Sequence, residues 1–205
     1  MPQRLAPQTV ALACHPARPS VAVRGLTASA RVGGAGKLAV RFELEADMSR
    51  IVMPPLRTPA RTDGLWRHTC FEMFIGLPDS DAYCELNFAP SGEWAMYGFV
   101  GYRRGMTPLE VRQPPRIAVR PMPRGLILEA ITHLEQLPKP GPGAPLRAGA
   151  AAVIEEKDVG LTHWALTHPA PEPDFHHAQG FVLEIGNVPQ GVSDLLLQAV
   201  GKATT

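Results

Sequence analysis

The 205-residue sequence is poor in cysteine, in charge and in long apolar runs. Its three cysteines (Cys14, Cys70 and Cys84) are odd in number and widely spaced, so we expect no disulfide framework. The 20 Lys and Arg residues balance 19 Asp and Glu residues and form no basic stripe, which argues against nucleic acid or an anionic membrane as a partner. No run approaches the roughly 20 apolar residues of a membrane span, and the first residues lack the pattern of a secretory signal. We therefore expect a cytoplasmic protein.

Catalytic and cofactor motifs are also missing. The sequence contains no GxSxG, HExxH or P-loop, and the glycine-rich run 33–36 lacks the flanking strand and helix of a dinucleotide site. Four histidines and an aspartate crowd into residues 163–177, but their spacing matches no zinc pattern. The sequence thus predicts no metal, no cofactor and no enzyme; it gives no indication of oligomeric state.

Proline and glycine, in contrast, are abundant. The 22 Pro and 19 Gly residues suit many loops between short strands, and a hydrophobic fraction of 45% suffices for a core. Lys37–Ala46 has the clearest period of two, with Leu38, Val40, Phe42 and Leu44 on one face and Ala39, Arg41, Glu43 and Glu45 on the other, which is typical of a strand with one face on the core. All-β domains often reach roughly 200–250 residues, so we expect residues 1–205 to form a single domain.

Further strands are expected throughout the chain, and one short helix is expected near its end. The segment Arg147–Glu156 is rich in alanine and would suit a helix, but its length and its Val153-Ile154 pair favour a strand. Residues 53–63, with three prolines, should be an irregular loop. Thr9–Cys14 is a short apolar run, and Ser20–Arg31 alternates loosely. The remaining strands are expected at Thr69–Ile75, Ala82–Phe88, Trp94–Arg103, Glu110–Arg120, Gly125–His133, Leu161–Leu166 and Phe181–Ile185, and the helix at Ser193–Val200.

The hairpin of residues 69–88 allows its register to be predicted. A turn centred on residues 78–81 places Ile75 opposite Cys84, Met73 opposite Leu86 and Phe71 opposite Phe88, which makes one wholly apolar face. The other face carries Cys70, Glu72, Phe74, Tyr83, Glu85 and Asn87, with Glu72 opposite Asn87. Carboxylates and an amide beside aromatic rings suit a sugar-binding face, because rings stack on pyranoses while polar groups bind hydroxyls. The alternative is the solvated face of an amphipathic sheet.

Two segments of the chain resemble a known family. The runs LWRHTCFEMFI and YCELNFAPSGEWAMYGFVGYRRGM, and later AAVIEEKDVGLTHWALTHPAPEPDFHHAQGF, are similar to intracellular bacterial DOMON-like proteins related to family nine carbohydrate-binding modules. Together these segments cover about a third of the chain. The resemblance implies an antiparallel β-sandwich of jelly-roll type and, less strongly, saccharide binding.

The candidate ligand-binding residues follow from the hairpin face and from this resemblance. Related modules hold a sugar between two tryptophans, sometimes with structural calcium. We expect Trp66 or Trp94 to stack on a sugar while Glu72, Glu85, Asn87 and Arg103 bind its hydroxyls. For each of the three tryptophans core packing is the alternative, and Trp164, within an apolar run, fits the core best.

Two other functions stay open. Some DOMON domains bind haem through Met and His; this chain has seven of each but no CxxCH motif and no marked axial pair. Glu72 and Glu85 lie diagonally on one sheet face, a geometry in which glycosidase chemistry is conceivable. The main prediction is a non-catalytic module with a saccharide ligand.

Overall fold

The alternating segment Lys37–Ala46 forms strand β4, with the predicted bounds. Leu38, Val40, Phe42 and Leu44 are buried, whereas most residues between them are partly exposed. The computed structural model describes residues 9–33, 37–76, 80–133 and 145–187. The expected helix Ser193–Val200 lies outside the described residues, as does most of the proline-rich segment 137–145.

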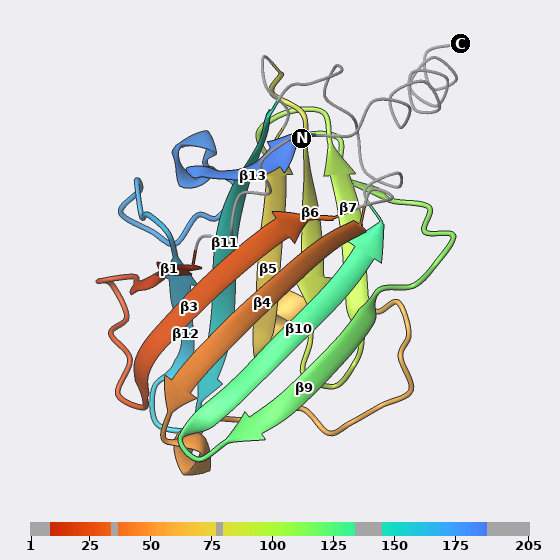
Figure 1. The fold of residues 1–205 in the computed structure, drawn as a ribbon. Helices are drawn as coiled ribbons and strands as arrows, with labels where there is room; N and C mark the ends of the chain where they lie inside the picture. The colour runs from red at the N-terminus through yellow and green to blue at the C-terminus, as the bar shows by residue number, and fades with distance from the viewer. Residues whose placement is uncertain (1–8, 34–36, 77–79, 134–144, 188–205) are drawn as a thin grey trace.

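Two antiparallel sheets pack face to face (Figure 1). The smaller sheet has five strands in the order β1 (Thr9–Ala11), β3 (Val23–Val32), β4, β10 (Gly125–His133) and β9 (Arg116–Met122). The larger sheet contains β2 (Ala13–Cys14), β12 (Gly160–Ala165), β11 (Pro145–Glu156), β5 (Cys70–Gly76), β6 (Tyr83–Phe88), β7 (Trp94–Phe99) and β8 (Thr107–Pro108), with β13 (Leu183–Asn187) paired to β11. The predicted all-β sandwich is confirmed, and Arg147–Glu156 is a strand.

The main core lies between the two sheets. The β5–β6 hairpin has the predicted register: Phe71 pairs with Phe88, Met73 with Leu86, and Ile75 with Cys84. These six side chains are buried in the core together with the apolar face of β4. The ring of Phe42, from the smaller sheet, lies 5.2 Å from that of Phe71 in the larger one, so aromatic contact joins the two layers.

The N-terminal segment passes from one sheet to the other. β1 pairs with β3 in the smaller sheet, and only two residues later β2 pairs with β12 in the larger sheet. Between them, Leu12 is buried in the core and its N–H donates to the carbonyl of Leu26 (2.8 Å). This segment therefore joins the two sheets at one edge of the sandwich.

Two predicted strands are shorter than expected. The strand expected at Glu110–Arg120 begins only at Arg116, because Pro114 and Pro115 precede it and lack the N–H groups that a sheet requires. The strand expected at Trp94–Arg103 ends at Phe99, and a tight turn follows in which Arg103 has a positive φ of 51°. Residues 53–63 form the irregular loop that the prolines predict.

Helical structure within the described residues is confined to short 3-10 turns. These are η2 (Met48–Arg50), η3 (Leu65–Arg67) and η5 (Ala178–Gly180). Over the described ranges, no helix has the length and apolar character needed to cross a bilayer.

Because Phe42 is fully buried and reaches Phe71 across the core, Phe42→Ala should leave a cavity and lower the free energy of unfolding by about 3–5 kcal/mol. Urea denaturation measures this change. The control is Leu56→Ala, since Leu56 is 85% exposed, and it should shift stability by no more than about 0.5 kcal/mol. A loss below about 1 kcal/mol for Phe42→Ala would contradict the packing described here.

Candidate functional site

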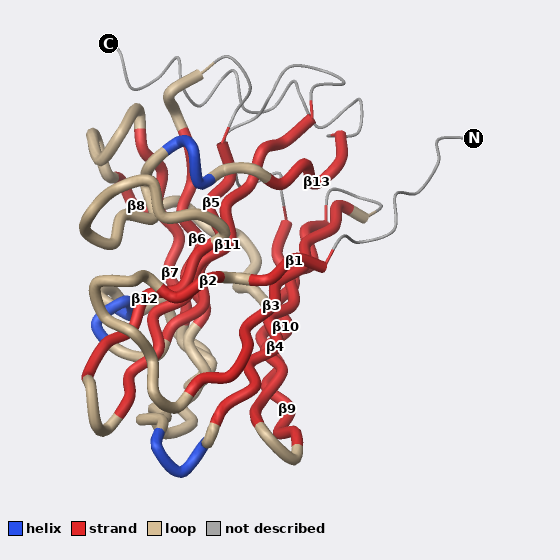
Figure 2. The backbone as a smooth tube through the Cα atoms, turned by 90° about the vertical axis from the view of Figure 1, so that its left-hand side faces the viewer, coloured by secondary structure: helices blue, strands red, loops and turns tan. Residues whose placement is uncertain are grey.

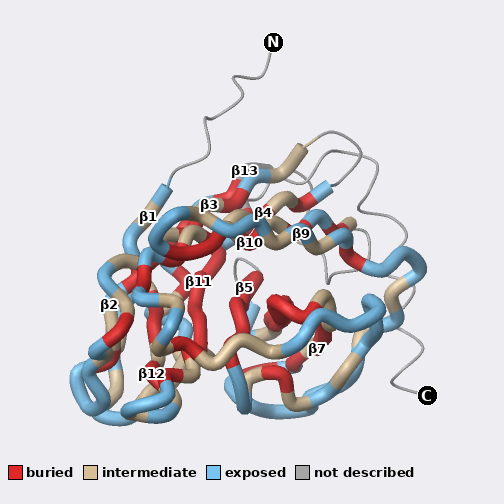
Figure 3. The backbone as a smooth tube through the Cα atoms, turned by 90° about the horizontal axis from the view of Figure 1, so that it is seen from below, coloured by how far each residue is buried: buried red, intermediate tan, exposed pale blue. Residues whose placement is uncertain are grey.

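The outer face of the larger sheet, which points away from the smaller sheet, is buried. Glu72 is 2% exposed, Glu85 5% and Asn87 0%. The structure therefore contradicts the alternative of a solvated sheet face. Figure 3 shows the contrast between β5, which is buried along its whole length, and β9, which is largely exposed or half-buried.

Loops and 3-10 turns cover this face and form a further layer beside the larger sheet (Figure 2). Their side chains join those of the sheet in a second apolar cluster, in which Leu65 of η3 and Phe181 after η5 are buried. The ring of Phe74, on β5, lies 5.9 Å from that of Phe181 and 6.4 Å from that of Phe175. The cover is thus held by aromatic contacts to the strands.

A cavity of about 330 Å³ opens between the sheet and this cover. Four of the six predicted ligand-binding residues line it: Trp66, Glu72, Glu85 and Arg103. The remaining lining residues come from β7, β11, β12 and two loops, and they are Phe99, Met106, Val153, His163, Pro173, Phe175 and His176. A space of this size suits a small organic ligand.

Glu72 and Glu85 occupy adjacent strands, as predicted. Glu72 pairs with Asn87 and Glu85 with Phe74, so the two carboxyl groups are diagonal neighbours on one face. The Nδ2 of Asn87 donates to Oε1 of Glu85 (2.7 Å), so Asn87 lies beneath the cavity and orients one of its carboxylates. The Oε1 of Glu72 is buried and has no hydrogen-bond partner among the described residues.

The two carboxyl groups differ in acidity. Burial, with the nearby charge of Glu85 as a second cause, raises the pKa of Glu72 well above its ordinary value. Burial also raises the pKa of Glu85, but the hydrogen bond from Asn87 and the charge of Arg103 oppose that rise. Glu85 should therefore ionise before Glu72, leaving the proton of the pair on Glu72.

His176 forms one wall of the cavity through its contact with Tyr83. Its Nδ1 lies 2.7 Å from the hydroxyl of Tyr83, and the backbone N–H of Arg103 donates to that same hydroxyl (3.1 Å). The other ring nitrogen of His176, Nε2, lies 3.7 Å from Oε2 of Glu85. Burial, aided by the charge of Arg103, lowers the pKa of His176 to about 4, so the ring is neutral near pH 7.

Arg103 is fixed in place by Asp174. The guanidinium donates to Oδ1 of Asp174 (2.9 Å), and the same carboxylate accepts from the hydroxyl of Tyr102 (2.6 Å) and from the N–H of His176 (3.1 Å). Burial alone would raise the pKa of Asp174, but the hydrogen bonds from Tyr102 and Arg103 outweigh it and lower that pKa. Asp174 is therefore ionised and balances the charge of Arg103.

The tryptophans are not brought together. Trp94 is 6% exposed and packs in the main core, as does Trp164, so neither lines the cavity and the expectation that Trp94 stacks on a ligand finds no support in its position. The alternation along β7 explains this placement, because Trp94 pairs with core residue Phe88. Trp66 alone borders the cavity, half-buried, with its ring 6.0 Å from that of Tyr97 and nearly perpendicular to it.

Sequence reasoning missed several cavity residues. Phe99 could have been found, because the register of β6 and β7 places it on the same face as Glu85. His176 and Phe175 belong to the Pro-Asp-Phe-His segment, but nothing in the sequence places this loop over β5. Only the folded chain brings His176 to Tyr83, 93 positions away.

Within the described ranges, no three His, Cys, Asp or Glu side chains are grouped so as to hold a metal ion. The ring nitrogens of His176 already face Tyr83 and Glu85, so this residue does not fit as an axial haem ligand.

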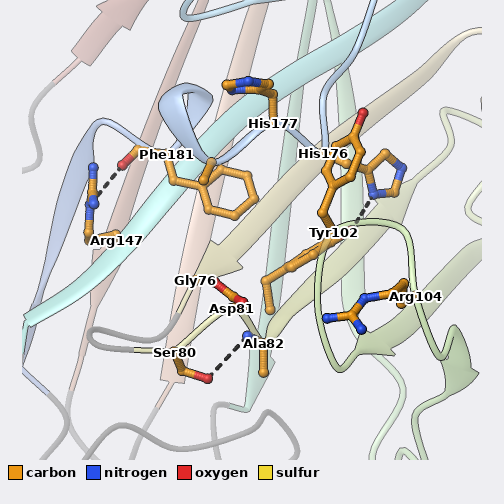
Figure 4. A pocket seen from close by; sticks show the side chains of 12 residues that line it. Gly76, Ser80, Asp81, Ala82, Tyr102, Arg104, Arg147, His176, His177 and Phe181 are labelled. Carbon is orange, nitrogen blue, oxygen red and sulfur yellow. Dashed lines mark hydrogen bonds between the residues drawn. The ribbon is translucent and has the colours of Figure 1, made fainter.

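A second hollow of about 620 Å³ lies on the other side of His176 (Figure 4). Arg104 and Arg147 stand on opposite sides of it, and Phe181 forms its apolar wall. The Nε of Arg147 donates to the carbonyl of Phe181 (3.1 Å), which fixes that arginine against the covering loop. His176 thus lines both hollows.

The protonated Glu72 should make stability depend on pH. Its raised pKa means that the folded state keeps a proton which the unfolded chain releases, so stability should fall as the pH rises above the ordinary carboxyl range. Glu72→Gln keeps the shape without the charge. It should flatten this fall above the ordinary carboxyl range in urea denaturation. Glu110→Gln, at an exposed position, is the control, and equal slopes for both variants would refute the assignment.

The chain matches no protein-family model and no curated protein. Among solved structures, it is similar to a candidate carbohydrate-binding protein from Bacteroides uniformis ATCC 8492, with a TM-score of 0.60, 10% identity, and coverage of 85% of this chain and 84% of that one. Two structures of a family 9 carbohydrate-binding module from Caldicellulosiruptor kristjanssonii, one with glucose and one with cellotriose, have TM-scores of 0.46 and 11% identity. They cover 88% and 86% of this chain, respectively, and 86% of each module. At such identities the likeness to the Bacteroides uniformis protein shows a shared fold.

Proposed function

We propose that the cavity bordered by Trp66, Glu72, Glu85 and Arg103 binds a saccharide. The observation that carries the proposal is the joining of an aromatic ring, two buried carboxyl groups and a fixed guanidinium in one space of about 330 Å³. The resemblance to DOMON-like and family nine sequences supports it. So does the fold shared with the Bacteroides uniformis protein, which is described as a candidate carbohydrate-binding protein.

Each group has a distinct part in such a complex. The exposed part of the Trp66 ring offers an apolar surface for a pyranose, since its edge contact with Tyr97 leaves the ring half-buried. The Glu72 carboxyl that lines the cavity forms a hydrogen bond with a hydroxyl, and Arg103 donates to a hydroxyl or ring oxygen. Because Asn87 and Asp174 hold Glu85 and Arg103 in place, little side-chain entropy is lost on binding.

Replacing Trp66 should weaken saccharide binding. Trp66→Ala removes the stacking surface, and we expect a loss of about 1–2 kcal/mol, or roughly tenfold in Kd. Titration calorimetry against mono- and disaccharides measures it. Trp66→Phe is the matched control, because it keeps an aromatic face and should recover part of the affinity. A well-folded wild type that binds none of the sugars would overturn the proposal.

A second candidate function is glycoside hydrolysis, and the different acidities of the two cavity carboxyls favour it. Glu72 retains its proton by burial, while Asn87 and Arg103 favour the ionised form of Glu85. A protonated acid beside a carboxylate is the pair that glycosidases use: the acid gives its proton to the leaving oxygen, and the carboxylate attacks the anomeric carbon or activates water.

Hydrolysis of chromogenic glycosides tests this candidate. Turnover should fall by at least about a hundredfold in both Glu72→Gln and Glu85→Gln, since each loses one of the two catalytic groups. Glu110→Gln should retain the wild-type rate. If the wild type releases chromophore no faster than buffer does, hydrolysis is excluded for those glycosides.

A further inference from the structure

The charges around the cavity leave an excess of carboxyl groups. Arg103 is the cationic side chain of the described lining, and Asp174, 2.9 Å away, already balances it. Burial lowers the pKa of both His176 and His163, so both rings are neutral near pH 7. Against these groups stand Glu72, which keeps its proton, and Glu85, whose charge no described cation balances fully.

The free oxygen of Glu72 is the second observation. Buried polar atoms nearly always have a hydrogen-bond partner, and an atom left without one costs free energy. Glu72 Oε1 is buried and unpaired, although the carboxyl lines an open cavity. A ligand that brings a positive charge beside this carboxyl would relieve this cost.

Aromatic rings complete the environment. Trp66, Phe99 and Phe175 line the same cavity as the two carboxyls. The faces of aromatic rings attract cations, and rings combined with a carboxylate form the usual environment of a bound ammonium group. A neutral hexose would contact the rings and form the hydrogen bonds. It would bring no positive charge to balance the negative charge of the carboxyl pair.

We propose that the cavity selects a saccharide bearing a free amino group, with the ammonium placed against Glu72 and Glu85. This inference rests on the proposed saccharide binding and specifies its ligand class. The ammonium lies against the Glu72 carboxyl where it lines the cavity, and the sugar ring packs on Trp66. Binding releases one proton. Protonated Glu72 and the ammonium sugar give the carboxylate–ammonium pair and a free proton.

Three sugars that differ at one position test the proposal: glucose, N-acetylglucosamine and glucosamine. Titration calorimetry on the full chain should give a Kd for glucosamine at least about tenfold lower than for either neutral sugar, and high salt should reduce this preference. The enthalpy of glucosamine binding should also change with the ionisation enthalpy of the buffer, because a proton is released. Equal affinity for all three sugars would overturn selection for the amine but would still support saccharide binding. If none of the three sugars binds, both proposals are contradicted.

Glu72→Gln tests the residue itself. The variant should lose affinity for glucosamine about tenfold more than for glucose, and its proton release should disappear. Glu110→Gln, outside the cavity, should keep the wild-type preference. Thermal unfolding confirms that both variants fold. A Glu72→Gln protein that folds and still prefers glucosamine as the wild type does would contradict the role given to Glu72.

Discussion

Strands β5 and β6 are buried on both faces, and the candidate site depends on this constraint. One face packs on the smaller sheet, and the other lies under a cover of loops and 3-10 turns. Polar side chains on the covered face cannot turn to bulk water, so each must find an internal partner or remain unpaired at a cost. Asn87 and Glu85 satisfy each other, whereas Glu72 keeps one free oxygen.

Low solvent access also explains the acidities at the site. Three buried groups at the cavity show this effect. Glu72 keeps its proton, Glu85 is favoured as a carboxylate by the amide of Asn87 and the guanidinium of Arg103, and the imidazole of His176 is neutral. These states follow from burial first and from neighbouring charges second. The outer wall behaves differently: Asp174 accepts three hydrogen bonds and is ionised, so it ties Arg103 and Tyr102 to the loop that carries His176.

Much of the sandwich could be predicted from the sequence, because strand alternation is a local signal. The bounds of β4 and the pairing of Phe71 with Phe88 follow from it directly. The sequence also predicted that Glu72, Glu85 and Asn87 share one face. It could not show that this face is buried, because the cover comes from Trp66 and from Phe175, whose loop lies about a hundred residues further along the chain. The sequence places Trp94 at the start of a strand, but only the pairing of Trp94 with Phe88 shows that its side chain faces the core, whereas Trp66 borders the cavity.

The cavity has a floor of paired strands and walls of loops. This division determines which parts of the cavity can accept substitutions. The carboxyl groups stand on β5 and β6, whose backbones are fixed by neighbours on both sides. The aromatic and cationic groups belong mainly to η3, to the turn after β7 and to the loop before η5, which tolerate substitution and length changes more readily. Directed evolution of these walls is therefore a route to new ligand preferences that leaves the acidic floor and the folding of the sandwich intact.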